Sequence, residues 1–222
     1  MEQVGLAFRA TKDLAIVLKA EALDPGFVKA FWAFITEGQY VTAQTKEGKP
    51  TYYRFISPKT AGFPSMLEIL STRPERMGPA DGVHLTPLPF DEGLSSLSAI
   101  LLQDEYYSFL KAGIREVDGV SVVGPEHLIP LKARAWLDLK DRRAAGHDIH
   151  SGDINKHRKD VFRLFRIIDP APRADVPPAI QADLRRFFVE ARSEPIDLKS
   201  IGISRSSLDE VLAQLGRIYG AG

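Results

Sequence analysis

The sequence predicts a mixed α/β (α+β) fold in two parts, and three features of the 222-residue chain support this. Up to about residue 123, short apolar segments alternate with turns rich in Gly, Pro and charge, which is typical of strands. After Pro125 the apolar residues recur at helical spacing. A proline-rich stretch at 170–178 then precedes two further helical segments. We therefore expect an α/β core over residues 1–123 and a helical domain over residues 124–222.

The first part is expected to contain strands and two helices. DLAIVL, at residues 13–18, is short and apolar between polar neighbours, as in a buried strand. Pro25 can begin a helix that ends at Gly38. The apolar face of that helix would hold Phe27, Ala30, Phe31, Phe34 and Ile35. Further strands are expected at 40–44, 52–56, 65–70 and 84–88 and after an Asp-Gly turn within 117–123, and a helix at 105–112. The segment 95–102 is apolar and of uncertain type.

The second part is expected to be helical. Apolar residues at helical spacing predict one long helix that runs from after Pro125 to about Ala145, before Gly146. Three more helices are expected, at 153–165, 179–191 and 206–219. The last would begin with Ser206 or Ser207 as its N-cap, because Glu210 follows at the spacing of a capping box.

Composition restricts what the protein can be. Hydrophobic residues at 44% and charged residues at 26% are ordinary globular values, which excludes a disordered or fibrous chain. The chain has no cysteine, so disulfides, thiolate metal sites and cysteine nucleophiles are excluded. No apolar run approaches the roughly 18–20 residues that span a bilayer, and the first residues lack an apolar core of the signal-peptide type. We therefore expect a cytoplasmic protein without a membrane partner.

The charge is balanced overall but unevenly distributed. Lys and Arg number 29, as do Asp and Glu, so the formal net charge is zero. Residues 132–166, however, contain ten Lys or Arg and five Asp, a net charge of +5. This segment can form a basic patch for a polyanion. The alternative is a solvated helical surface with internal pairs such as Arg134–Asp138.

Two acidic residues lie in apolar strand candidates. Asp13 opens DLAIVL, and Glu68 is inside PSMLEIL. A carboxylate in an apolar strand is costly to bury unless it finds a partner or a metal. If the two strands were neighbours, these carboxylates would come together. The alternative is that each marks a strand end and pairs with Lys or Arg.

Common signatures of nucleotide, metal and hydrolase sites are absent. The sequence contains no GxxxxGK[ST], GxGxxG, HExxH or GxSxG motif. His147, His150 and His157 lack a standard metal-ligand spacing and are expected to be surface residues.

Four segments, in order along the chain, resemble one family. RATKDLAIVL, FPSMLEIL, IPLKARAWLDLKDR and INKHRKDVFRLF are similar to motifs of the polymerase-β-like nucleotidyltransferases. In particular, they resemble the AbiEii/AbiGii-type nucleotidyltransferase toxins of bacterial toxin–antitoxin systems. The segments span residues 9–166, about 70% of the chain. The resemblance implies a mixed-sheet polymerase-β-type nucleotidyltransferase core followed by a C-terminal helical bundle.

The resemblance also implies an activity. A nucleotide would move from an NTP to an acceptor hydroxyl, with tRNA or another RNA as the expected acceptor and an antitoxin protein as a possible partner. Two Mg²⁺ ions would take part, one activating the attacking hydroxyl and one binding the triphosphate. A small-molecule acceptor, such as an antibiotic or a metabolite, is a third possibility.

The matched motifs imply the site residues. Asp13 and Glu68 would be metal ligands, Lys132 would reach the triphosphate, and Asp160 would hold Lys132 or a neighbouring Arg in place. The implied catalytic residues are thus Asp13, Glu68, Lys132 and Asp160. The implied nucleotide-binding residues are Arg9, Thr11, Lys12, Lys132, Arg142 and Arg143. Residues 132, 136, 140 and 143 would share one helical face.

The chain departs from the family pattern in two places. The family has its second acidic metal ligand at the position of Ala15, and a methyl group cannot bind a cation. The family also has a Gly-Gly or Gly-Ser pair on a helix just before this strand, whereas Gly5 stands alone before Arg9. We therefore expect weak or no transfer activity from this chain. The alternative is a catalytically inactive relative that binds nucleotide, RNA or an antitoxin.

Overall fold

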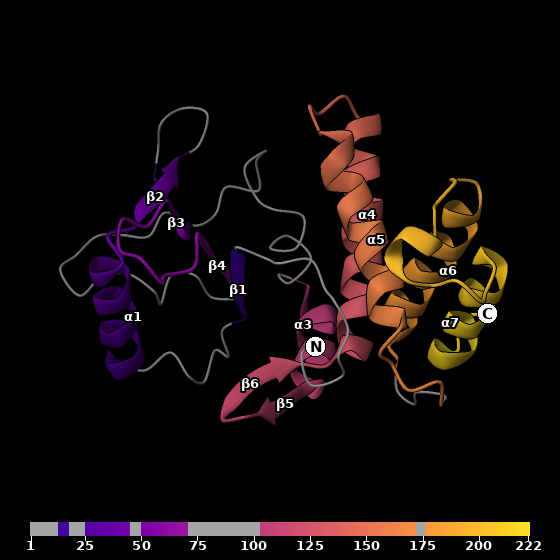
Figure 1. The fold of residues 1–222 in the computed structure, drawn as a ribbon, viewed down its shortest axis with the longest axis horizontal. Coiled ribbons are helices and arrows are strands. Elements are labelled where there is room, and N and C mark those ends of the chain that lie inside the picture. The colour runs from indigo at the N-terminus through magenta and orange to yellow at the C-terminus, as the bar shows by residue number, and fades with distance from the viewer. Residues whose placement is uncertain (1–12, 18–24, 45–49, 71–102, 172–175) are drawn as a thin grey trace. The chain divides into compact units, whose positions relative to one another are not determined.

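The protein has a mixed α+β architecture, which confirms the predicted class at this level. The computed structural model describes residues 13–17, 25–44, 50–70, 103–171 and 176–222. The chain divides into two compact units, residues 1–102 and residues 103–222 (Figure 1). In the described residues there are six α-helices and six strands. None of these helices is long and apolar enough to cross a membrane.

The first unit contains a four-stranded sheet in the order β1-β4-β3-β2. The strands are β1 (Asp13–Val17), β2 (Val41–Gln44), β3 (Pro50–Ile56) and β4 (Met66–Leu70). Strand β1 runs parallel to β4, while β4 with β3 and β3 with β2 are antiparallel. The strands expected at 13–18, 40–44, 52–56 and 65–70 are therefore confirmed. The segments at 84–88 and 95–102 lie outside the described residues.

Helix α1 (Pro25–Glu37) packs against this sheet through aromatic side chains. Phe31 and Ile35 are buried with Phe55 of β3 and Leu67 of β4. The Phe31 and Phe55 rings meet edge to face, with their centroids 5.6 Å apart. Phe34, which helical spacing assigned to the apolar face, is 39% exposed. The buried face of α1 is therefore narrower than the sequence predicted.

The second unit is a helical assembly with one β-hairpin. Its elements are α3 (Asp104–Ala112), β5 (Ile114–Val117), β6 (Val120–Val123), α4 (Pro125–Ala144), α5 (Ser151–Phe165), α6 (Pro178–Arg192), a 3₁₀ turn η4 (Lys199–Ile201) and α7 (Leu208–Tyr219). The expected helices are all present. Strand β5 was not predicted. Its sequence IREV has two adjacent exposed charged residues in the middle, so it lacks the alternation of buried and exposed residues that marks a strand.

Helix α4 is the centre of this unit. Its side chains at Ile129, Ala133, Trp136 and Leu137 are fully buried. It contacts α3, α5 and α6, and in Figure 1 it runs beside α5 along its length. The Trp136 ring meets Phe187 of α6 edge to face at 5.2 Å. Apolar packing around α4 therefore holds the helices together.

The boundary between the units differs from the predicted one at residues 123/124. Helix α3 belongs with the later helices, because the Tyr106 hydroxyl donates a hydrogen bond to Asp183 Oδ2 of α6 at 2.8 Å. Burial, with the charge of Asp183 beside it, raises the pKa of Tyr106, so the phenol stays protonated and donates. The hairpin is also tied to α4, since Gly124 N donates to Gly113 O at 2.9 Å. The predicted boundary thus falls inside the second unit.

The start of α7 allows a direct stability test. Ser207 and Glu210 form a capping box, in which the serine Oγ accepts from Glu210 N and the carboxylate accepts from Ser207 N at 2.7 Å. We expect Ser207→Ala to lower the free energy of unfolding by about 1 kcal/mol, because the backbone N–H of Glu210 loses its side-chain acceptor. Urea unfolding followed by circular dichroism measures this. Ser206→Ala, at the exposed preceding residue, is the control, and equal losses in both variants would contradict the assignment.

Candidate functional site

Strands β1 and β4 bring together the two positions that the sequence singled out as metal ligands. In their parallel register, Asp13 lies opposite Met66 and Ala15 lies opposite Glu68. Parallel partners project to the same side of a sheet, and alternate residues share a face. Positions 13, 15 and 68 are therefore on one face of two adjacent strands. The two strands are therefore neighbours, as the prediction for Asp13 and Glu68 required. The binding of metal by these two residues stays a prediction.

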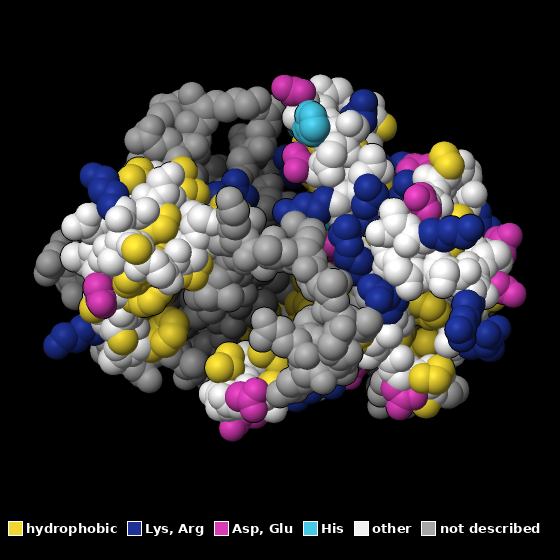
Figure 2. Space-filling view, in the orientation of Figure 1, with side chains coloured by type: hydrophobic (Ala, Val, Ile, Leu, Met, Phe, Trp, Pro, Cys, Tyr) yellow, Lys and Arg dark blue, Asp and Glu magenta, His cyan; other side chains and the backbone are white. Residues whose placement is uncertain are grey.

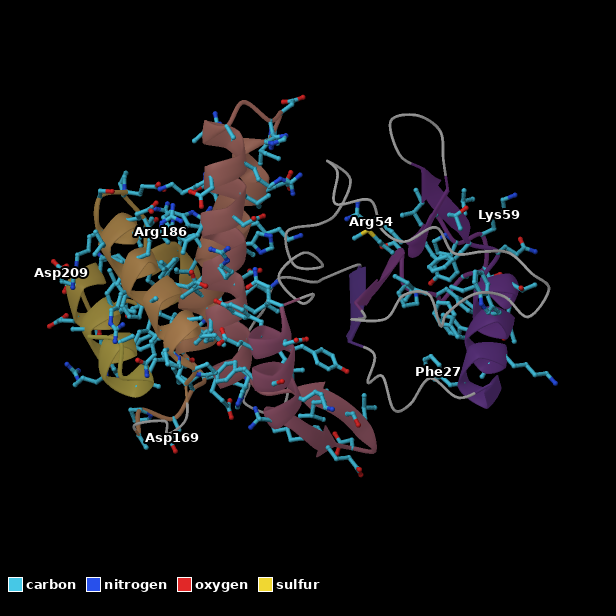
Figure 3. The ribbon with its side chains drawn as sticks, turned by 180° about the vertical axis from the view of Figure 1, so that it is seen from behind. Phe27, Arg54, Lys59, Asp169, Arg186 and Asp209 are labelled. Carbon is cyan, nitrogen blue, oxygen red and sulfur yellow. The ribbon has the colours of Figure 1, made fainter. Side chains whose placement is uncertain are left out.

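The departure from the family motif lies at the centre of this arrangement. Ala15 is the direct register partner of Glu68, and Arg54 of β3 is the partner of Glu68 on its other side (Figure 3). An acidic residue at position 15 would thus adjoin both Asp13 and Glu68. With alanine there, acidic residues occupy two of the three positions at which the resemblance implies metal ligands.

A buried carboxylate defines a second candidate position, in the helical unit. Asp160 of α5 has only 3% of its side chain exposed, because it lies beside the buried residues Val161 and Phe162. Its Oδ2 is 3.7 Å from Lys132 Nζ of α4, and its Oδ1 is 3.1 Å from Arg163 Nη1. A buried carboxylate needs such partners, because an unpaired charge is costly to desolvate. The contact expected between Asp160 and Lys132 is present, and the three residues together carry one net positive charge.

Two of the residues expected to share one face of α4 with Lys132 contact α6. Trp136 is fully buried against α6, and Lys140 Nζ lies 4.2 Å from the centre of its ring. Lys140 Nζ is also 2.8 Å from carboxylate oxygens of Glu190 and Glu194. Positions 136 and 140 therefore serve the contact between α4 and α6. The face expected to hold residues 132, 136, 140 and 143 is thus partly covered by α6, and the nucleotide-binding roles implied for Lys132 and Arg143 stay predictions.

Arg142 and Arg143, the other predicted nucleotide-binding residues of α4, are not next to Lys132. Arg142 and Arg143 are in the last turn of α4, and Arg143 is exposed. Ten or eleven residues of helix separate them from Lys132, which is about 15 Å along the axis. Arg9, Thr11 and Lys12 lie outside the described residues.

The sequence missed a set of ion pairs between α4, α5 and α6. Arg186 makes a two-pronged contact with Asp141, with Nη1 2.8 Å from Oδ2, and its hydrogen bonds lower the pKa of the Asp141 carboxyl (Figure 3). Arg158 is 5% exposed and donates to the backbone oxygens of Glu194 and Pro195. These pairs join residues 36 to 45 positions apart, so no local pattern could reveal them. These contacts hold the helices together and do not by themselves indicate a catalytic group.

Two further findings bear on the site. In the part of the chain that the structure describes, no group of three or more His, Cys, Asp or Glu could hold a metal ion. Comparison of the chain with protein-family models, with curated proteins and with solved structures found no match. The strand register and the cations around Asp160 are therefore the observations that bear on function.

Asp160 can be tested as the organiser of Lys132 and Arg163. We expect Asp160→Asn to lower the free energy of unfolding by about 2 kcal/mol, because it leaves two cations near an uncharged buried group. The loss should be smaller than the ~3–5 kcal/mol typical of fully buried pairs, since both cations reach solvent. Urea unfolding gives the value. Asp153→Asn, at an exposed carboxylate on the same helix, should change stability little; a matching loss there would argue against a special role for Asp160.

Proposed function

We propose that the protein is a nucleotidyltransferase-fold protein of toxin–antitoxin type. Its ancestral reaction is the transfer of a nucleotide from Mg²⁺-NTP to an acceptor hydroxyl, with tRNA or another RNA as acceptor, in the bacterial cytoplasm. In the chain as it stands this transfer is impaired, because position 15 lacks a carboxylate.

One observation carries the proposal, the parallel pairing of β1 with β4. The strand register sets position 13 and position 68 one pleat apart, with position 15 directly beside 68. These are the three positions at which the resemblance implies acidic metal ligands. The ion pair of Lys132 with Asp160 adds support, because it holds the amine of Lys132 at a fixed place on α4.

The residues present fit one magnesium ion better than two. Asp13 and Glu68 supply carboxylate oxygens, which are the ligands that Mg²⁺ prefers, and Mg²⁺ commonly keeps several waters beside one or two carboxylates. Bound there, the metal would supply neutralisation of phosphate charge. Ala15 contributes no ligand atom, so these positions would not supply the carboxylates to hold a second Mg²⁺ ion.

A second function is favoured by the same alanine. The chain would then be a catalytically inactive relative that binds nucleotide, RNA or an antitoxin. Ala15 beside Glu68 supports this directly, since the resemblance implies a metal ligand at position 15 and a methyl group cannot bind a cation. The two functions differ in whether restoring the carboxylate restores transfer.

Restoration of the carboxylate is the first test. We expect Ala15→Asp to label RNA when each of the four α-labelled NTPs is incubated with total tRNA and Mg²⁺, because the third carboxylate completes the metal-binding face. The unaltered chain should label RNA weakly or not at all. Labelled RNA is measured after gel separation.

Ala15→Asn is the matched control, since asparagine has nearly the shape of aspartate without its charge. It should not label RNA, and neither should Ala15→Asp combined with Asp13→Ala. Labelling by the asparagine variant would contradict the metal-ligand argument. Absence of labelling by Ala15→Asp, with Mg²⁺-NTP binding retained, would favour the inactive binding protein.

Lys132 is tested separately by nucleotide binding. We expect Lys132→Ala to weaken Mg²⁺-NTP binding at least tenfold in isothermal titration, because its amine is the cation held by Asp160. The fold should survive, since Asp160 keeps Arg163 as a partner. Lys199→Ala, at an exposed lysine of η4, is the control. Unchanged affinity in Lys132→Ala would remove Lys132 from the proposed site.

A further inference from the structure

We propose that the exposed face of α5 binds the phosphate backbone of RNA through Lys156, Lys159 and Arg163, here called the basic row. This inference rests on the proposed function for the choice of RNA as partner. It assigns residues other than those proposed above to bind metal and nucleotide. It can therefore be tested without NTP and without metal.

The basic row follows from helical geometry. Its residues are spaced i, i+3 and i+7, so they lie on one face of α5. From Lys156 to Arg163 the helix rises by about 10 Å. Lys159 is exposed, Lys156 is half-buried and Arg163 has 22% of its side chain exposed. Figure 2 shows Lys and Arg side chains gathered over α4 and α5, the helices that carry this row.

Most of the positive charge on the basic row is available to a ligand. Among the residues that the structure describes, neither Lys156 nor Lys159 forms an ion pair. Arg163 pairs with Asp160, but that carboxylate is 3% exposed and is shared with Lys132. Asp153, one turn before Lys156, is the exposed carboxylate on the same helix. The face of α5 is therefore net positive toward solvent.

The surface favours a polyanion over a protein partner. Protein interfaces depend on an apolar and aromatic centre. The exposed residues of α5 are Ser151, Gly152, Asp153 and Lys159, none of which is apolar. Regularly spaced phosphates need only cations at intervals along a line, and neutralising them releases condensed counterions. A nucleic-acid backbone thus matches both the charge and the lack of apolar surface.

The test measures binding of fluorescein-labelled tRNA to the full chain by fluorescence anisotropy over a range of salt concentrations. We expect Lys156→Gln with Lys159→Gln to weaken binding by on the order of tenfold in low salt. The slope of log K against log salt should fall by about 2, because two phosphate contacts are lost. Arg205→Gln with Arg217→Gln is the matched control. It removes the same charge from two exposed residues outside α5 and should leave affinity within about twofold.

Three results would overturn the inference. The unaltered chain could fail to bind tRNA, or the two double variants could weaken binding equally, which would show an effect of net charge alone. Poly-L-glutamate could displace labelled tRNA as well as unlabelled tRNA does, which would indicate an acidic protein partner. Loss of tRNA binding in Lys156→Gln with Lys159→Gln, with Mg²⁺-NTP binding unchanged, would support the basic row. Failure of Ala15→Asp to transfer nucleotide would leave that support intact.

Discussion

The helical unit depends on one constraint: α4 is packed on several sides, so the charged groups that this packing removes from solvent need partners nearby. Removing a charge from water is costly unless an opposite charge and hydrogen bonds replace the lost hydration. Lys132 meets Asp160 of α5, Arg134 meets Asp183 of α6, and Lys140 meets Glu190 of α6 and Glu194 just after it. These pairs set how α5 and α6 lie against α4. The aromatic contact of Trp136 with α6 fills the space between them.

The same constraint changes the meaning of the basic segment 132–166. Counted along the sequence, the segment has a surplus of five positive charges. In the folded unit, several of its cations are neutralised by carboxylates of α6, which lie outside the segment. The surplus that reaches solvent is therefore concentrated on α5 and at the end of α4. Counting charges along the sequence located the surplus of positive charge but overstated how much of it reaches solvent.

Secondary structure was largely predictable, while the packing between elements was not. The apolar periods of the long helix and of α5 were enough to place them, and the serine and glutamate before α7 indicated its first turn. The pairing of the strand that holds Asp13 with the strand that holds Glu68 was inferred from the chemistry of carboxylates. Nothing in the local sequence specifies which strands are neighbours. Strand β5 was missed because a two-stranded hairpin with exposed charges lacks the alternation of a buried strand. The partners of Arg158 and Arg186 were beyond reach because they are brought together only by folding.

The two candidate positions differ in what folding requires of them. Asp160 must be paired wherever α5 packs on α4, so its contact with Lys132 contributes to stability whether or not a nucleotide binds. The register of β1 with β4 instead sets which strand positions adjoin, and Glu68 there also has Arg54 as its partner on β3. The strand register therefore bears on the proposed chemistry, while the helical ion pairs bear on the fold.

The alanine opposite Glu68 also has a genetic consequence. Every alanine codon is a single base substitution away from a codon for aspartate or glutamate. A carboxylate at this position can therefore arise in one mutational step, without any rearrangement of the strands. If the proposed transfer activity is toxic, a growing population would continually produce such variants and select against them.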